Sequence, residues 1–223
     1  MTRLARFALR RLVALAVLIS AQPASAVDWL VLVVDRSNSI SRDQLSLQRQ
    51  AYARVLRDAS IVEILRDAGV AIVEFDSEAE VIVPWTTAED AASRYENWNS
   101  SRLRGGTAIG AGLSAAMDLL AGKDGARVID ISGDGRDNRN PVLLDAALAR
   151  ATGSGVEVNG LVLREDDRND IAAYYRQRVV NGFVIMIERW EDFENSLKRK
   201  IGLEARLSQA RPASGRDFST VTN

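Results

Sequence analysis

The chain has 223 residues, of which 47% are hydrophobic and 26% charged, and it contains neither cysteine nor histidine. A chain of this size can bury one sizeable core, so a single domain is the simplest expectation. The lack of cysteine excludes a disulfide framework, a thiol nucleophile and a thiolate metal site. The lack of histidine removes the usual base of serine hydrolases and the usual zinc ligand, so the ordinary catalytic triad is excluded.

The first 26 residues differ from the rest and predict a secretory signal peptide. Four arginines accompany a short apolar run at 12–19, and Ala24-Ser25-Ala26 supplies the small residues that a signal peptidase accepts. We expect cleavage after Ala26 and export to the periplasm or beyond, with an uncleaved anchor as the alternative. No later stretch approaches the roughly 20 apolar residues that a membrane span requires, so no integral span is expected after cleavage.

Charge also limits the class of partner. Without the four arginines of the signal segment, 25 basic residues remain against 30 acidic ones. The mature chain is therefore mildly acidic, and it has no basic run with interleaved aromatic residues. Binding to nucleic acid is not expected.

Apolar runs alternate with amphipathic stretches along residues 27–202, the pattern of strands alternating with helices. The first strand, 27–34, is continuously apolar, as a fully buried parallel strand is. A helix is predicted at 44–59, followed by two short strands at 70–75 and 79–85. The three residues between these strands are too few for a helical crossover and predict an antiparallel hairpin at a sheet edge.

The second half repeats the alternation. Helices are predicted at 87–98 and 109–120, a strand at 127–131, a helix at 141–152, a strand at 156–163, a helix at 170–179, a strand at 183–187 and a helix at 190–201. The predicted fold class is α/β, a doubly wound, mostly parallel six-stranded sheet with one antiparallel edge strand and helices on both faces. The domain is expected at 27–203. From Glu204 to residue 223 a disordered tail is expected, because apolar residues become too sparse to offset the entropy of ordering.

Oxygen-bearing side chains gather in three separate loops. Asp35, Ser37 and Ser39 form a DxSxS motif directly after the first strand, Thr107 follows two glycines before a helix, and Asp134 follows the 127–131 strand. In open parallel sheets, ligands bind beyond the carboxyl ends of the strands where the winding reverses. Three hydroxyls and two carboxylates suit Mg²⁺ or Mn²⁺, which prefer oxygen ligands. A coordination position left open could take a carboxylate from a partner.

These five residues, in this order and on these elements, resemble the von Willebrand factor type A domain with its metal-ion-dependent adhesion site (MIDAS). The resemblance covers residues 27–202, and the chain looks most like exported, single-domain bacterial proteins of this type. It implies that Ser37, Ser39 and Thr107 contact the metal through hydroxyl oxygens, and that Asp35 and Asp134 often act through water. The chain departs from the wider family at Gly133, where threonine is common.

Each feature also has a simpler reading. Asp and Ser often cap helices or fill turns, so DxSxS alone is weak evidence for metal binding. Asp130 and Glu74 lie in apolar strands, where we expect each to pair with a backbone group or an arginine such as Arg127, rather than to support the metal site. The residues that flank the ligands could select a partner or form ordinary solvated loops: Arg36, Asn38, Arg136, Asp137 and Asn138.

Three functions remain open. The first is a noncatalytic, metal-dependent module that recognises an acidic side chain of a protein partner, because no proton-transfer residue accompanies the oxygen ligands. The second is a Mg²⁺-dependent phosphohydrolase, although its arrangement would require an aspartate at the position of Ser37 and a lysine near Thr107. The third is a scaffold that uses the edge strand or the C-terminal tail without metal.

Overall fold

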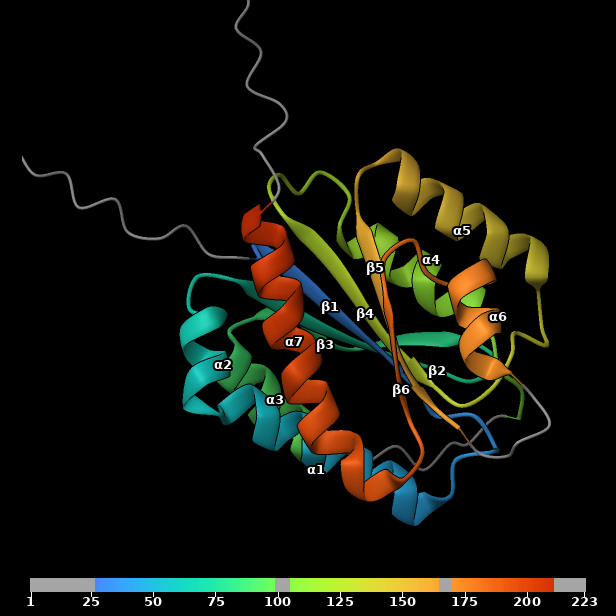
Figure 1. Ribbon diagram of the computed structural model, residues 1–223, viewed down its shortest axis with the longest axis horizontal. Coiled ribbons are helices and arrows are strands. Elements are labelled where there is room, and N and C mark those ends of the chain that lie inside the picture. The colour runs from blue at the N-terminus through green and yellow to red at the C-terminus, as the bar shows by residue number, and fades with distance from the viewer. Residues whose placement is uncertain (1–26, 99–104, 165–169, 211–223) are drawn as a thin grey trace, which may run out of the picture.

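The computed structural model describes residues 27–98, 105–164 and 170–210. Within these ranges six strands form one sheet: β1 (Trp29–Asp35), β2 (Gly69–Phe75), β3 (Ala79–Thr86), β4 (Arg127–Gly133), β5 (Glu157–Leu163) and β6 (Val184–Ile187). Their order is β3-β2-β1-β4-β5-β6 (Figure 1). Only the pairing of β2 with β3 is antiparallel, which confirms the predicted mostly parallel sheet with one reversed edge strand.

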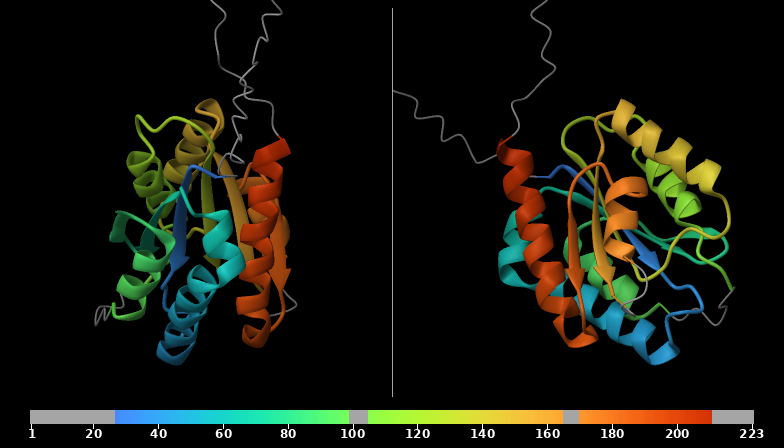
Figure 2. Two further views of the ribbon diagram at one scale, coloured as in Figure 1. Left: turned by 90° about the vertical axis from the view of Figure 1, so that its left-hand side faces the viewer. Right: turned by 45° about the vertical axis from the view of Figure 1, so that its right-hand side comes forward.

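Helices cover both faces of this sheet (Figures 1 and 2). One face carries α1 (Arg42–Arg57), α2 (Ala59–Ile64), α3 (Ala88–Glu96) and α7 (Phe193–Ala210), and the other carries α4 (Ile109–Leu119), α5 (Pro141–Gly153) and α6 (Ile171–Arg178). A short 3-10 helix, η1 (Trp190–Asp192), precedes α7. The predicted α/β class is confirmed.

The two-layered core explains why β1 is apolar at every position before its last residue, Asp35. Leu30, Leu32 and Val34 pack under the helices of one face, and Val31 and Val33 pack under those of the other. All five side chains are at most 1% exposed. Because successive residues of a strand point to opposite faces, a strand covered on both sides has no position for a solvated side chain.

The winding of the sheet reverses between β1 and β4, which are neighbours although two other strands lie between them in sequence. The loops after Asp35 and after Gly133 therefore leave the same end of the sheet, side by side. The start of β1 and the end of α7 lie at the opposite end (Figures 1 and 2). This placement concentrates the predicted ligand residues at one end of the molecule.

The end of the last helix differs from the prediction. Helix α7 continues to Ala210. The prediction of a disordered tail beginning at Glu204 is therefore wrong for residues 204–210. Glu204 is only 1% exposed, and it accepts a hydrogen bond from Lys200 one turn earlier, at 2.6 Å, which offsets the cost of burying its carboxylate. A glutamate in such a sequence is normally predicted to be exposed to solvent, because the sequence does not show that a buried lysine of the same helix pairs with it. The predicted signal segment and residues 211–223 lie outside the described residues.

Lys200 also explains the charged residue inside β4. Its Nζ atom lies 2.7 Å from Oδ2 of Asp130, and both side chains are fully buried. The expectation that Asp130 would be paired is confirmed, but Arg127 as its partner is wrong, because Arg127 instead donates to the Ser154 carbonyl. Within the described ranges, no helix has the length and apolarity needed to cross a membrane.

Candidate functional site

The first ligand loop begins where β1 ends. Asp35 is fully buried, and its Oδ1 atom accepts a hydrogen bond from the backbone N–H of Ser37 at 2.7 Å. This contact turns the chain sharply after the strand, as Asp commonly does in turns. Its other oxygen, Oδ2, is buried without a hydrogen-bond partner. One half of the carboxylate is thus held by its own loop and the other half is free.

Ser39 joins the first loop to the loop after β4. Its hydroxyl donates to Oδ1 of Asp134 at 2.7 Å and is hydrogen-bonded to the Ser37 hydroxyl at 3.1 Å. Ser37 is 1% exposed, whereas Ser39 is exposed to solvent. The structure therefore brings Asp35, Ser37, Ser39 and Asp134 into one chain of contacts, with Ser39 at its open side.

Thr107 lies beside this group at the entrance to α4. Its backbone N–H donates to the Asn138 side chain at 2.9 Å, and its carbonyl accepts from the Asn138 backbone at 3.0 Å. A side chain at Gly135, next to Asp134, would place its Cβ 3.4 Å from the Thr107 hydroxyl oxygen. Gly106 precedes it with a φ of 111°, a conformation that glycine adopts without strain. The third predicted loop thus adjoins the second.

Further hydrogen bonds connect the segment at the start of α4 to the β2–β3 turn and to the loop after β4. The backbone N–H of Ala108 donates to the Asp76 carbonyl in the β2–β3 turn at 2.6 Å. Asp137 accepts from the Gly110 backbone in the first turn of α4 at 2.8 Å, where a helix N-terminus favours negative charge. Asp137 and Asn138 are therefore not simply solvated loop residues, because both hold the Thr107 segment in place.

Arg36, inside the DxSxS motif, points away from the opening. It is 5% exposed, and its guanidinium contacts Glu74 and Asp76 at 3.2 and 3.1 Å. Glu74 is also held by Arg49 and by the Tyr95 hydroxyl. The expected pairing of Glu74 with an arginine is confirmed, and Arg36 anchors its loop to β2 instead of facing a partner.

The electrostatics of the site follow from two carboxylates sharing a buried space. Burial raises the pKa of Asp35 to about 8, and the nearby charge of Asp134 adds to this rise. Burial also raises the pKa of Asp134. Within the described part of the chain, neither carboxylate forms an ion pair with a basic side chain. Ionising both carboxylates would therefore create negative charge that no basic side chain in the described ranges balances.

This donor set fits a hard divalent cation. Its atoms are all oxygens, one buried carboxylate oxygen lacks a partner, and two acidic groups lack a counter-charge. No group of three or more acidic side chains in the described ranges could hold a metal ion, so any such ion would depend on the hydroxyls of Ser37, Ser39 and Thr107. Few formal charges and several neutral oxygens are what leave a bound cation electrophilic.

Two tyrosines of α6 approach the site from the α6 side of the sheet, and neither was predicted to take part in it. The hydroxyl of Tyr174 accepts from the Asp137 backbone at 3.1 Å. The hydroxyl of Tyr175 is fully buried, lacks a hydrogen-bond partner and, like Oδ2 of Asp35, lies close to Gly133. The signal that could have found them was Gly133, which leaves space beside Asp35 for a side chain from elsewhere.

The comparisons with known proteins concern the family and the fold of the chain. A family model described as "Protein of unknown function (DUF1194)" matches residues 26–209. The chain belongs to this family. A comparison with curated proteins found no match.

Solved structures place this DUF1194 member among von Willebrand factor A-like folds. An aerotolerance-related membrane protein from Bacteroides fragilis, solved with multiple mutations to serines, is 21% identical with a TM-score of 0.60, over 81% of this chain and 99% of that one. A von Willebrand factor type A protein from Catenulispora acidiphila is 17% identical with a TM-score of 0.63, over 80% and 43%. Proximal thread matrix protein 1 from the mussel byssus, with a zinc-occupied MIDAS motif, is 16% identical with a TM-score of 0.64, over 80% and 46%.

At these identities the likeness shows the fold alone. This chain spans nearly all of the Bacteroides protein but less than half of the other two. The von Willebrand factor A-like fold predicted from the sequence is confirmed.

Proposed function

We propose that the chain is a noncatalytic binding module that holds Mg²⁺ or Mn²⁺ at the MIDAS-like site and recognises an acidic group of a protein partner through the metal. The observation that carries this proposal is the junction of Ser37, Ser39 and Asp134 by hydrogen bonds beside a buried, half-free Asp35. A metal-free protein gains nothing from two adjacent buried carboxylates, since each raises the cost of ionising the other. A bound cation would remove that cost and would supply an electrophilic centre for an incoming carboxylate.

The residues divide into two roles in this proposal. Ser37, Ser39 and Thr107 would offer hydroxyl oxygens, and Asp35 and Asp134 would balance the charge of the cation. Ser39 lies on the solvent side, so the open position would face outward at this end of the sheet. The zinc-occupied MIDAS of the mussel protein supports divalent metal binding as the role of such a site.

Export to the periplasm or beyond is part of the same proposal. It rests on the predicted signal segment at residues 1–26. The likeness to an aerotolerance-related membrane protein is in keeping with work at or outside the membrane.

Thermal unfolding with and without Mg²⁺ or Mn²⁺ tests the metal. Ligand that binds only the folded state stabilises it by about 1.4 kcal/mol at roughly tenfold excess over Kd. We expect this gain for the wild type and none for Asp35→Ala, with Asp145→Ala, which removes an exposed partner of Arg178, as the control that keeps it. Equal gains for the wild type and Asp35→Ala would refute the proposal.

The partner is tested by capture from a periplasmic extract with and without chelator. We expect a partner that is retained only with metal and that is released by free acetate or glutamate at high concentration. Capture that persists in chelator would instead favour the metal-independent scaffold.

No observation favours the phosphohydrolase. Ser37 stands where that chemistry needs an acid, and all three lysines of the chain are occupied elsewhere. Lys123 lies over the Trp29 ring, Lys198 pairs with Asp58, and Lys200 pairs with Asp130. Hydrolysis of a generic phosphate ester that disappeared in Asp35→Asn would revive this alternative.

A further inference from the structure

Two buried polar atoms without partners meet at one place behind the candidate metal site. Oδ2 of Asp35 and the hydroxyl of Tyr175 both lack a hydrogen bond, and both residues are fully buried. A Cβ built on Gly133 would lie 2.5 Å from the Tyr175 hydroxyl oxygen and 2.9 Å from Oδ2 of Asp35. The two atoms therefore border the same small space, which exists because residue 133 has no side chain.

The sheet holds Tyr175 in this position. Val33, Ile131 and Val158 face the α6 side of the sheet, so Asp35, Gly133 and Gly160, each two residues farther along its strand, face that side as well. A Cβ on Gly160 would lie 3.3 Å from Cδ1 of the Tyr175 ring.

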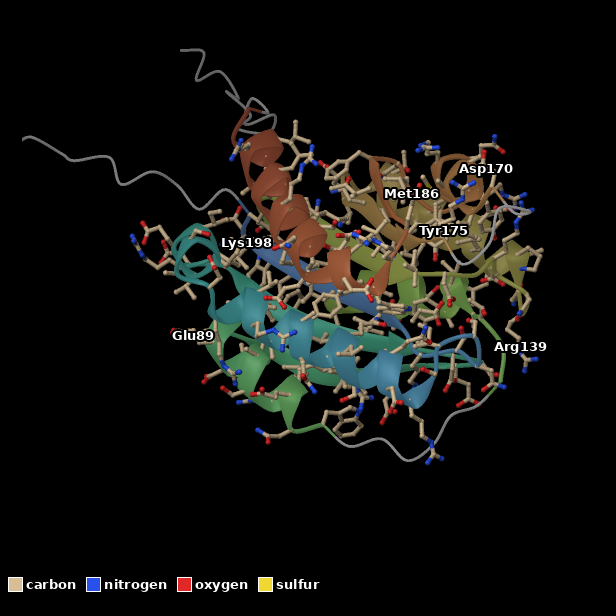
Figure 3. The ribbon with its side chains drawn as sticks, turned by 60° about the horizontal axis from the view of Figure 1, so that its bottom comes forward. Glu89, Arg139, Asp170, Tyr175, Met186 and Lys198 are labelled. Carbon is tan, nitrogen blue, oxygen red and sulfur yellow. The ribbon has the colours of Figure 1, made fainter. Side chains whose placement is uncertain are left out.

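The ring thus lies across two neighbouring strands at positions where both carry glycine, and its hydroxyl reaches towards β1. Figure 3 shows Tyr175 within the outline of the molecule, whereas Asp170, the cap of α6, and Arg139 lie at its rim.

Leaving this pair unmatched would be costly. A buried donor or acceptor without a partner costs about 1–3 kcal/mol, so native proteins rarely keep two of them side by side. A phenol can donate, and an ionised carboxylate oxygen can only accept, so each atom has what the other lacks. Oδ1 of Asp35 is already held by the Ser37 backbone at 2.7 Å, which leaves Oδ2 to set the plane of the carboxylate.

We propose that Tyr175 is a positioning residue for metal binding, whose hydroxyl donates to Oδ2 of Asp35 and fixes the orientation of that carboxylate towards the cation. This inference rests on the proposed function. Gly133 is required for it, because any side chain there would occupy the space of the hydroxyl. Since Gly133 does not have a positive φ, a side chain is excluded by space alone and not by the backbone.

The test compares Tyr175→Phe, Gly133→Ser and the double variant with the wild type. Titration calorimetry with Mg²⁺ or Mn²⁺ gives the metal affinity, and urea unfolding in chelator gives the stability without metal. We expect Tyr175→Phe to weaken metal binding by about 10- to 100-fold, the usual effect of removing a group that orients a ligand. Its stability in chelator should not fall, because the hydroxyl has no hydrogen-bond partner in the metal-free structure and makes the proposed bond only when a bound cation keeps Asp35 ionised.

Gly133→Ser should lower stability in chelator, since its Cβ meets the Tyr175 hydroxyl. In the double variant the serine hydroxyl enters the vacated space, and metal affinity should rise at least about tenfold above that of Tyr175→Phe. Tyr95→Phe is the matched control, because its buried hydroxyl donates to Glu74 at 3.0 Å. It should lower stability in chelator and leave metal affinity unchanged.

The outcomes separate the inference from the proposed function. Wild-type metal affinity in Tyr175→Phe would overturn the inference and leave the metal site standing, and so would a double variant as weak as Tyr175→Phe. Parallel losses of stability and affinity in Tyr175→Phe and Tyr95→Phe would show that the hydroxyl is merely structural and would also overturn it. A wild type that binds neither cation would overturn both proposals.

Discussion

Glu74 and Asp35 are fully buried carboxylates at the ends of neighbouring strands, but their surroundings differ. Glu74 accepts bonds from Arg49 at 2.8 and 2.9 Å, from Arg36 at 3.2 Å and from Tyr95 at 3.0 Å. Oδ1 of Asp35 accepts from the Ser37 backbone, and its second oxygen has no hydrogen bond. The difference teaches how to tell two kinds of buried charge apart: one is saturated by the protein and holds the fold, and the other is left short of donors and awaits a ligand.

The largest effect is expected when the saturated cluster is broken. Glu74→Ala removes the carboxylate that Arg49 and Tyr95 bind and one of the acidic partners of Arg36, which should lower the free energy of unfolding by about 3–5 kcal/mol. Urea unfolding in chelator measures this. The control is Glu96→Ala, which removes an exposed partner of Arg57 and should cost less than about 1 kcal/mol. Similar losses in the two variants would contradict the structural role of Glu74.

The unsaturated carboxylate should respond to pH in the opposite sense from an ordinary ion-paired acid. Its pKa rises from 3.8 to about 8 in the metal-free fold. Within that window the unfolded chain has lost the proton that the folded chain keeps, so the free energy of unfolding falls as pH rises. We expect the wild type in chelator to lose stability relative to Asp35→Asn between about pH 5 and about pH 8.

Urea unfolding at several pH values tests this difference. The raised pKa of Glu204 acts in the same direction but is common to both proteins, so it cancels when the two curves are subtracted. Saturating Mg²⁺ should restore the wild type and leave Asp35→Asn unchanged. A difference curve that is flat, or that rises with pH, would count against the unbalanced burial of Asp35.

The smallest effect on stability is expected at Asp137, whose side chain connects the loop after β4 to the start of α4. Asp137→Ala removes the acceptor for the Gly110 backbone in the first turn of α4, a loss of about 1 kcal/mol by analogy with helix caps. Metal affinity should fall by about 10- to 100-fold, because the segment that carries Thr107 is then held by Asn138 without the bond from Asp137 to the start of α4. Calorimetry and unfolding of the same samples check both values, and an unchanged affinity would show that Thr107 keeps its place without this clamp.

The same contrast marks what sequence reasoning could reach. The strands, the reversed edge strand and the meeting of the loops after β1 and β4 were predictable, because each depends on a local pattern or on the rule for parallel sheets. Helix α2 and the last turns of α7 were not, since α2 is short and Glu204 is buried by a lysine one turn away.

The supports of the site were the hardest part to predict. Tyr175 approaches the site from α6, and Asp130 pairs with Lys200, which is 70 positions away in the sequence. Neither contact produces a residue spacing from which it could be predicted. Ligand residues can be recognised by a sequence motif, but the identity of the side chains that orient them depends on tertiary packing. Gly133 was the only local hint, and it indicated a gap without naming the residue that fills it.

The hydrogen bond between Ser39 and Asp134 joins residues 95 positions apart, which has a consequence for folding kinetics. Contacts across so long a span form late, because the loop must close before they contribute. The metal site is therefore not yet formed in the folding transition state, so a cation cannot bind there. Metal binding should slow unfolding while leaving the folding rate nearly unchanged. Loss of the ion would then shorten the lifetime of the native chain and expose it to proteases long before any fall in equilibrium stability unfolded most of it.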